Sequence, residues 1–174
     1  MSEIVLRPMA AADIPAVLAV QAQCYGDALL ESSEALASRL ELSPSTCWVA
    51  TLPDNTLAAY LFTHAWPEAT LPPWNGLLTR DWDDPETLTW FIHDMAVAPI
   101  GRGAGLATRL YAAAEQSARM LNLTSSRLIA VQSAAAWWRR IGYTPLAESQ
   151  AAPHAAKLAT YGADATLMER GLDG

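Results

Sequence analysis

Three glycines and an arginine fall within ten residues in the segment APIGRGAGLA, residues 98–107. An apolar run precedes this segment and an alanine-rich amphipathic stretch follows it, which predicts a connection from a strand to a helix. The unpaired N–H groups at the start of that helix and the helix dipole favour an anion. Because Gly103, Ala104 and Gly105 are small, a phosphate could approach their backbone closely. The segment is therefore a candidate phosphate-binding turn.

Two common phosphate-binding motifs do not fit this turn. A Walker P-loop needs a lysine followed by serine or threonine after its glycines, and a dinucleotide fingerprint needs GxGxxG after the first strand. The turn lies late in the chain and has neither pattern, which argues against a nucleotide-binding protein. A turn without a ligand remains the alternative, because glycine also serves wherever a connection requires positive φ.

The remaining sequence predicts a mixed α/β fold of about seven strands and four helices, with residues 1–174 forming one domain. Short apolar runs bounded by proline or turn residues predict strands over residues 3–7, 46–51, 56–66, about ten residues within 87–99, 127–131 and 163–172. Helical spacing and caps predict helices from Asp13 through Gln21, over Ser33–Leu42, over Leu106–Leu121, and over Ala134–Arg140 with Ser133 as its cap. The long loop 67–86 is a candidate binding segment.

Two motifs in this order resemble one known family. The turn resembles the R/Q-x-x-G-x-G/A signature of the GNAT acetyltransferase superfamily, with Arg102, Gly105 and Ala107 in the defining places. About 30 residues later, WWRRIGY at 137–143 is similar to the family's FYxxxGF segment. The first strand and helix and the last strand also resemble the family, so the resemblance covers nearly the whole chain. It implies a mostly antiparallel, centrally splayed sheet of about seven strands flanked by about four helices.

The resemblance implies acetyl-CoA as the cofactor, bound in the gap between the fourth and fifth strands. The pyrophosphate is then expected on the backbone amides of six consecutive residues: Arg102, Gly103, Ala104, Gly105, Leu106 and Ala107. The pantetheine arm is expected along the strand at Met95, Ala96 and Val97, with Trp138 flanking the cofactor. The amide of Met95 or Ala96 is expected to hold the thioester oxygen as it gains negative charge.

The resemblance also implies direct attack by a primary amine of a small molecule or peptide in a ternary complex. An alkylammonium has a pKa of about 10, so it needs a base near neutral pH. His93 and Asp94 are an adjacent titratable pair on the strand before the turn, and strand alternation predicts that one of them, not both, faces the cleft. We expect His93 to be the base, because its ordinary pKa lies closest to neutrality and its place resembles a strand histidine of arylalkylamine-type acetyltransferases. A structural role remains open for both residues.

Trp138 stands where many members of the family have a tyrosine that protonates the leaving thiolate, and an indole N–H is no useful acid. Tyr161 is the first candidate to replace it and Tyr143 the second, while departure without an acid remains open because a free thiol has a pKa of about 8.5. Strands 46–51 and 56–66 are expected to form a β-hairpin, because Pro53, Asp54 and Asn55 between them are turn residues. Residues after the first helix and at the end of this hairpin are expected to bind the acceptor, with Glu31 pairing with a cationic amine: Tyr25, Glu31 and Trp66.

Composition limits the classes of partner. A hydrophobic fraction of 52% with 17% charged residues predicts a folded domain, and a net charge of −7 without a basic cluster argues against nucleic acid. Cys24 and Cys47 lack metal-ligand spacing, so neither a metal site nor a disulfide is expected. Without a signal segment or a long apolar run, we expect a cytoplasmic protein with no membrane partner, as a monomer or homodimer. A catalytically silent CoA-binding domain is the alternative function, which Trp138 favours.

Overall fold

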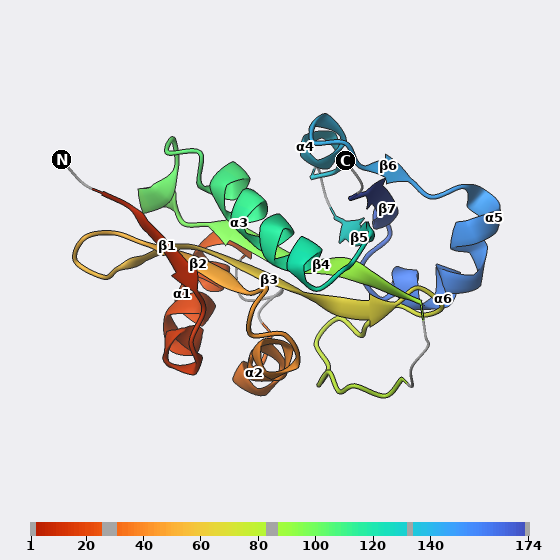
Figure 1. Ribbon diagram of the computed structural model, residues 1–174, viewed down its shortest axis with the longest axis horizontal. Helices are drawn as coiled ribbons and strands as arrows, with labels where there is room; N and C mark the ends of the chain where they lie inside the picture. The colour runs from red at the N-terminus through yellow and green to blue at the C-terminus, as the bar shows by residue number, and fades with distance from the viewer. Residues whose placement is uncertain (1–2, 26–30, 83–86, 132–133, 173–174) are drawn as a thin grey trace.

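The computed structural model describes residues 3–25, 31–82, 87–131 and 134–172. Its strands form one sheet in the order β1-β2-β3-β4-β5-β7-β6 (Figure 1). The strands are β1 (Val5–Pro8), β2 (Trp48–Thr51), β3 (Leu57–Pro67), β4 (Leu88–Val97), β5 (Ser125–Ala130), β6 (Thr144–Pro145) and β7 (Thr166–Gly171). Every neighbouring pair is antiparallel except β4 and β5, which are parallel. The predicted mixed, mostly antiparallel sheet is confirmed.

Helices cover both faces of this sheet (Figure 1). Helices α1 (Ile14–Tyr25) and α2 (Ser33–Leu42) pack on one face, and α3 (Leu106–Met120) packs on the other. The shorter helical segments are α4 (Ala135–Arg140), α5 (Glu148–Ala151), α6 (Ala155–Ala159) and the 3-10 turns η1 (Ala11–Asp13), η3 (Pro99–Gly101) and η4 (Ala152–His154). Helices α5 and α6 come in addition to the predicted ones. The cap predicted at Ser133 lies outside the described residues.

The β3 strand shows why the central sequence is apolar without interruption. Leu61 packs into the cluster beneath α3, whereas Tyr60 and Phe62 pack into the cluster beneath α1 and α2. A strand buried on both faces needs apolar side chains at consecutive positions, not at alternate ones. The long apolar run therefore marks the middle of the sheet.

A β-bulge interrupts the pairing of β3 with β4. Asp94 pairs with Phe62, but the next residue of β3, Thr63, pairs with Ile92, so His93 is an additional residue in β4. A bulge of this kind bends the strand and breaks the alternation of side chains. It lies at the adjacent titratable pair of His93 and Asp94.

The parallel strands β4 and β5 separate beyond a short paired stretch. Their pairing covers only Trp90 to Ile92 on β4 and Ser126 to Leu128 on β5. Beyond it, β4 continues to Val97 and leads through η3 into α3. The resulting gap opens toward the N-terminus of α3, which confirms the predicted splay of the sheet.

Candidate active site

A groove leads from the start of α3 through the gap between β4 and β5 into an inner cavity. Ala107 and Trp138 line its outer part, and Met95 and Trp138 line its middle part. The inner cavity has a volume of about 280 Å³ and is lined by both His93 and Asp94. The outer and middle parts share Met95 and Trp138, and the middle and inner parts share His93 and Asp94, so Ala107 at the start of α3 and the titratable pair border neighbouring parts of the groove.

The turn before α3 has the features that an anion cradle requires. Gly103 and Gly105 have φ values of +88° and +66°, which L side chains rarely adopt. Gly105 is the N-cap of α3, and no side chain caps this helix end. A Cβ added at either glycine would meet no atom within 4 Å. Open space therefore lies beside these two glycines at the uncapped start of α3, which a pyrophosphate-binding turn requires.

At alternate residues of β4, the backbone groups turn away from β3 toward the gap. Ala98 donates its N–H to the Ala58 carbonyl on the β3 side, so alternation along an antiparallel pair turns Met95 and Val97 toward the gap. Two side chains of α1 agree with this orientation. The Tyr25 hydroxyl donates to the Met95 carbonyl at 2.9 Å, and the Cys24 thiol donates to the Val97 carbonyl at 3.3 Å.

The expectation that only one residue of the titratable pair faces the cleft is wrong. Both His93 and Asp94 line the inner cavity, because the bulge at His93 removes the alternation on which that expectation rested. The sequence contains no glycine or other bulge signal at this point of β4. The bulge thus brings an imidazole and a carboxylate together.

Asp94 is a half-buried carboxylate with an unusually high pKa. Its Oδ2 accepts a hydrogen bond from the Tyr60 hydroxyl at 2.6 Å and one from Gln21 Nε2 at 3.0 Å. Burial, followed by the nearby charge of Glu31, raises the pKa of Asp94 to about 6, although both hydrogen bonds and Arg39 oppose the rise. A carboxylate with this pKa can take up a proton near neutral pH.

His93 is neutral in this environment. Burial, the positive charge of Arg39 and the neighbouring His64 hold the pKa of His93 well below its ordinary value. Its Nδ1 lies 3.0 Å from His64 Nε2, and its buried Nε2 has no hydrogen-bond partner in the described part of the chain. The base that we expected is thus the weaker proton acceptor of the pair.

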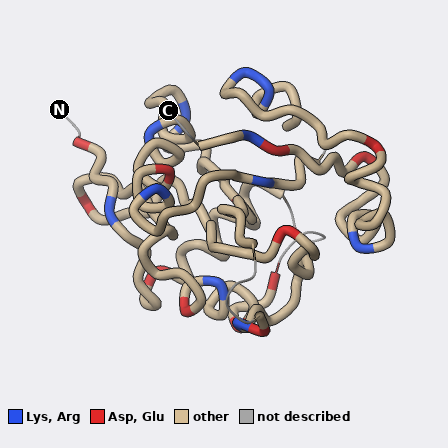
Figure 2. The backbone as a smooth tube through the Cα atoms, turned by 45° about the vertical axis from the view of Figure 1, so that its right-hand side comes forward, with Lys and Arg blue, Asp and Glu red and all other residues tan. Residues whose placement is uncertain are grey.

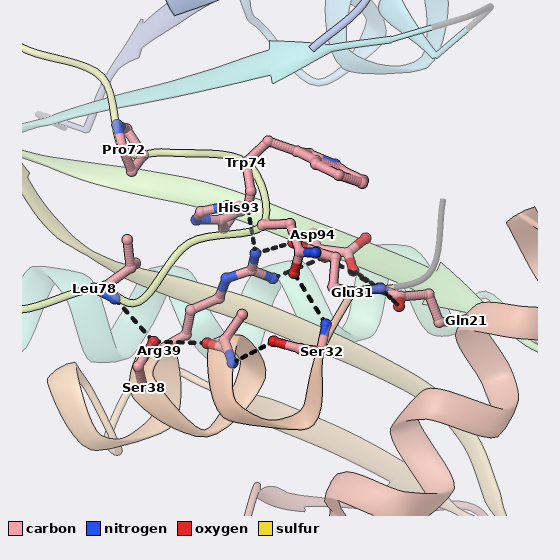
Figure 3. A network of polar contacts seen from close by, with 12 residues as sticks. Gln21, Glu31, Ser32, Ser38, Arg39, Pro72, Trp74, Leu78, His93 and Asp94 are labelled. Atoms are coloured by element: carbon pink, nitrogen blue, oxygen red, sulfur yellow. Dashed lines mark hydrogen bonds and ion pairs between the residues drawn. The ribbon is translucent and has the colours of Figure 1, made fainter. Parts of the chain in front are cut away.

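Glu31 lines the cavity, but its charge is already paired. Arg39 from α2 donates to both carboxylate oxygens of Glu31, and its guanidinium also donates to the Trp74 carbonyl at 3.1 Å (Figure 3). Both side chains are almost fully buried. The expectation that Glu31 pairs with a cationic amine therefore needs correction, because the Glu31 carboxylate already forms an ion pair with Arg39.

Comparison with known proteins gives a family. The sequence profile of the "Acetyltransferase (GNAT) family" matches residues 14–143. The chain belongs to the GNAT family. A comparison with curated protein sequences finds no match.

Solved structures with the GNAT fold resemble the whole chain. Ard1 from Thermoplasma volcanium has a TM-score of 0.72 at 16% identity, over 98% of this chain and 99% of that one. The ribosomal-protein-S18-alanine N-acetyltransferase from Escherichia coli has a TM-score of 0.67 at 15% identity, over 99% and 96%. YhbS from Escherichia coli, solved with CoA, has a TM-score of 0.66 at 14% identity, over 99% and 83%. At these identities the likeness shows the fold.

The tyrosines expected as acids have other partners in this GNAT domain. Tyr161 lines the cavity. Its hydroxyl donates to the Pro72 carbonyl in the 67–82 loop at 2.7 Å, and burial raises the pKa of Tyr161. Tyr143 is fully buried on the α3 face, where its hydroxyl lies 2.6 Å from Ser126 Oγ and 3.1 Å from the Tyr111 hydroxyl. Tyr143 is absent from the cavity lining, which excludes it as an acid there.

Trp66 does not line the cavity, contrary to our expectation. It packs edge-on against His64 and Trp82, and its Nε1 donates to Thr70 Oγ1 at 3.1 Å. Trp74, from the same loop, lines the cavity instead. Of the three residues expected to bind the acceptor, Tyr25 and Glu31 are therefore the two that reach it.

Sequence reasoning missed several residues that shape this GNAT site: Gln21, Arg39, Tyr60 and His64. Gln21, Tyr60 and His64 are polar within largely apolar segments, and Arg39 lies on the apolar face of an amphipathic helix beside Ala35, Leu36 and Leu40. All of them are buried, and a buried polar group needs a partner. A polar residue on a core-facing position was therefore the signal that was available.

Charged residues elsewhere are dispersed. Figure 2 shows basic positions on separate elements of the described chain, with acidic positions between them. The described residues contain no cluster of three or more His, Cys, Asp or Glu side chains that could hold a metal ion. Cys24 and Cys47 are both free thiols in the structure. Within the same residues, no helix has the length and apolar character needed to cross a bilayer.

Proposed function

We propose that this chain is an acetyl-CoA-dependent N-acetyltransferase that acts on a primary amine of a small molecule or peptide. The observation that carries the proposal is the continuous groove, which joins an uncapped helix start to a cavity holding a carboxylate with a pKa of about 6. The GNAT neighbour YhbS was solved with CoA, which supports the same cofactor for this groove.

The cofactor is assigned to the groove residue by residue. The amides of residues 102–107 would hold the pyrophosphate, and the gap-facing backbone at Met95 and Val97 would pair with the pantetheine arm. Trp138 is buried against Tyr111 and borders the groove, so it would form its wall. Acetyl-CoA supplies the activated acetyl thioester.

Asp94 is the base in this proposal. Its carboxylate accepts the proton that the acceptor ammonium must lose before its nitrogen can attack, and its raised pKa suits that transfer near neutral pH. Tyr60 and Gln21 hold the carboxylate in place through Oδ2. His93, whose pKa is depressed, contributes a neutral imidazole to the cavity wall. The Met95 amide, which alternation turns toward the gap, is the oxyanion donor.

The two tyrosines that line the groove and the cavity, Tyr25 and Tyr161, both donate their hydroxyl proton to a backbone carbonyl. Trp138 has no acidic proton, and the Tyr161 hydroxyl donates to the Pro72 carbonyl. We therefore propose that the thiolate leaves without an acid from this chain. A free thiol has a pKa of about 8.5, so the step is slowed and not prevented.

The test combines binding with turnover. Calorimetric titration with acetyl-CoA measures the donor site, and a free-thiol assay with amines, polyamines and peptides measures transfer. We expect tight acetyl-CoA binding and thiol release that depends on an amine. Binding without amine-dependent release from any acceptor would favour the silent CoA-binding domain. A single domain, a cytoplasmic location and a monomer or homodimer stay as proposals beside this function.

A further inference from the structure

The inner cavity differs from an ordinary polar pocket in what its side chains can donate. Its ionisable lining residues are Glu31, His93, Asp94, Asp164 and two tyrosines, without any lysine or arginine in the described lining. The Arg39 guanidinium donates hydrogen bonds to the Glu31 carboxylate and to the Trp74 carbonyl (Figure 3). After this internal pairing, an acidic excess remains at Asp94 and Asp164.

The neutral donors of the cavity are also committed. Gln21 gives its Nε2 to Asp94 and Glu31, while its Oε1 accepts from the Glu31 N–H at 2.8 Å. The Tyr25 and Tyr161 hydroxyls both donate to backbone carbonyls. Each of these groups would have to give up a partner in order to bind an acceptor atom of a ligand.

His93 is excluded as a donor by its neighbour on β3. His64 Nδ1 lies 3.1 Å from the Ala65 carbonyl, and a carbonyl only accepts, so this nitrogen carries the proton. Neutral His64 then has a bare Nε2, which lies 3.0 Å from His93 Nδ1 and must accept from it. The proton of neutral His93 is thus on Nδ1, and its Nε2 is an acceptor.

The apolar walls complete the description of the ligand. Tyr25, Trp74 and Tyr161 present aromatic surface to the cavity, and Ile129 and Val131 present aliphatic surface. Apart from the uncharged indole N–H of Trp74, the side-chain donors of the described lining already have partners, so the lining leaves mainly acceptors for a ligand. The ligand that matches is a cation that donates, on an apolar body.

We infer that the acceptor is a primary amine with an aromatic or aliphatic body and without a carboxylate beside the amine. This inference rests on the proposed function, since it names the substrate of the same site. A carboxylate in this cavity would meet the carboxylate of Asp94, and also that of the exposed Asp164, without a charged donor, and a like-charge contact at a desolvated group such as Asp94 costs several kcal/mol. An ammonium group would instead be attracted by the negative charge of the Asp94 carboxylate.

The test uses three ligands of nearly the same shape: phenethylamine, phenylalaninamide and phenylalanine. Binding of each to the wild-type protein with CoA present is measured by calorimetry, and transfer is measured by thiol release from acetyl-CoA. Phenethylamine should bind at least about tenfold more tightly than phenylalanine, with the amide between them. Equal or tighter binding of phenylalanine would overturn the inference. Phenylalaninamide that binds as weakly as phenylalanine would also overturn it, because shape and not charge would then set the affinity.

Two further measurements keep this inference separate from the proposed function. Asp94→Asn supplies an amide donor and should narrow the preference for the amine over the amino acid, whereas Asp54→Asn, in the exposed β2–β3 turn, should keep it. Discrimination in binding without any turnover would refute the function and leave the inference standing. Turnover of phenylalanine as fast as that of phenethylamine would refute the inference and leave the proposed function standing.

The position of the proton on the His93 ring can be measured directly. The chain has three histidines, so a long-range ¹H–¹⁵N spectrum of the imidazoles is simple to assign, with His93→Gln identifying one of them. His93 should show a protonated Nδ1 and an unprotonated Nε2. His64→Phe should release this fixed tautomer, and Phe91→Leu, which changes ring contacts with His64 and His93 but removes no hydrogen bond of either histidine, should not. A protonated Nε2 in the wild type would place a donor in the cavity and contradict the inference.

Discussion

At the scale of single residues, Asp94 carries the proposed chemistry because of what surrounds it. Adjacent His93 has the ordinary pKa closer to neutrality, yet burial and nearby positive charge lower it. Burial acts on Asp94 in the opposite sense and raises its pKa to about 6. Burial disfavours the charged form of both groups, so it weakens a histidine as a base and strengthens a carboxylate. The environment therefore reverses the order that residue type alone suggests.

The pH dependence of transfer follows from this carboxylate. Asp94 must be deprotonated to act as a base, so the amine-dependent rate should rise as the pH increases through about 6. Asp94→Asn should lower kcat by roughly 10²-fold or more and remove this rise. Steady-state thiol release from mildly acidic to mildly alkaline pH measures both effects. An unchanged profile in the variant would remove Asp94 from the role of base.

The same carboxylate should cost stability at neutral pH. Its pKa is about 6 in the folded protein, against 3.8 for an unperturbed aspartate, so the folded state binds the proton more tightly between these values. Wild-type stability therefore falls as the pH rises from about 4 to about 6. Asp94→Asn lacks this loss, so its free energy of unfolding relative to wild type should improve over that range by at most about 3 kcal/mol. Urea denaturation at the two ends measures the change, and a pH-independent difference would contradict it.

At the scale of elements, the turn between β4 and α3 joins backbone conformation to binding. Gly105 has φ +66° and open space where a Cβ would stand. A side chain there would meet the strain of the left-handed region and would also project into the space assigned to the pyrophosphate. The two effects can be separated with a second glycine.

Gly105→Val should weaken CoA binding by about tenfold or more, that is by about 1.4 kcal/mol. The control is Gly142→Ala, at a φ of +109° after α4 and away from the turn, where an added Cβ would also meet the Arg170 side chain at 3.1 Å. Both variants should lose about 1–2 kcal/mol of stability from backbone strain, but only Gly105→Val should lose CoA affinity. Calorimetric titration with CoA and urea denaturation give the two quantities. Equal CoA affinity in the two variants would mean that the turn holds no phosphate.

Sequence reasoning predicted the elements that local signals specify. The helix start after Gly105, the long apolar β3 and the hairpin at Asp54 depend on residues close together in the chain, so their periodicity and turn chemistry were sufficient. The bulge at His93 was not predictable in this way, because it arises from the pairing of β4 with β3. Partners such as His64 with His93, 29 residues apart, likewise depend on the register of the sheet.

At the scale of the whole molecule, one buried ion pair joins segments that are distant in sequence. Arg39 of α2 links Glu31 to the Trp74 carbonyl in the loop over the cavity, and Leu78 of the same loop donates its N–H to Ser38 Oγ at 2.9 Å (Figure 3). Helix α2 thus anchors the loop that closes the acceptor cavity. The charge of Glu31 in the cavity lining and the position of the loop with Trp74 therefore both depend on the ion pair between Glu31 and Arg39.

Removal of one partner should be costly because it leaves a buried charge alone. Arg39→Met should lower the free energy of unfolding by about 3–5 kcal/mol, and adding Glu31→Gln should restore part of the loss. Urea denaturation of wild type, both single variants and the double variant measures the coupling. If the double variant were as unstable as the sum of the single variants, the pair would contribute no coupling and the account of the loop anchor would fail.

The most direct test of the central claim is identification of the product by mass spectrometry. Purified protein is incubated with acetyl-CoA and phenethylamine, beside reactions that lack the amine or contain Asp94→Asn. We predict N-acetylated phenethylamine and an equal amount of free CoA in the wild-type reaction, with far less in both controls. Saturation of the protein with acetyl-CoA but no acetylated amine, from phenethylamine or from any other amine tested, would contradict the claim that this groove and cavity form an N-acetyltransferase.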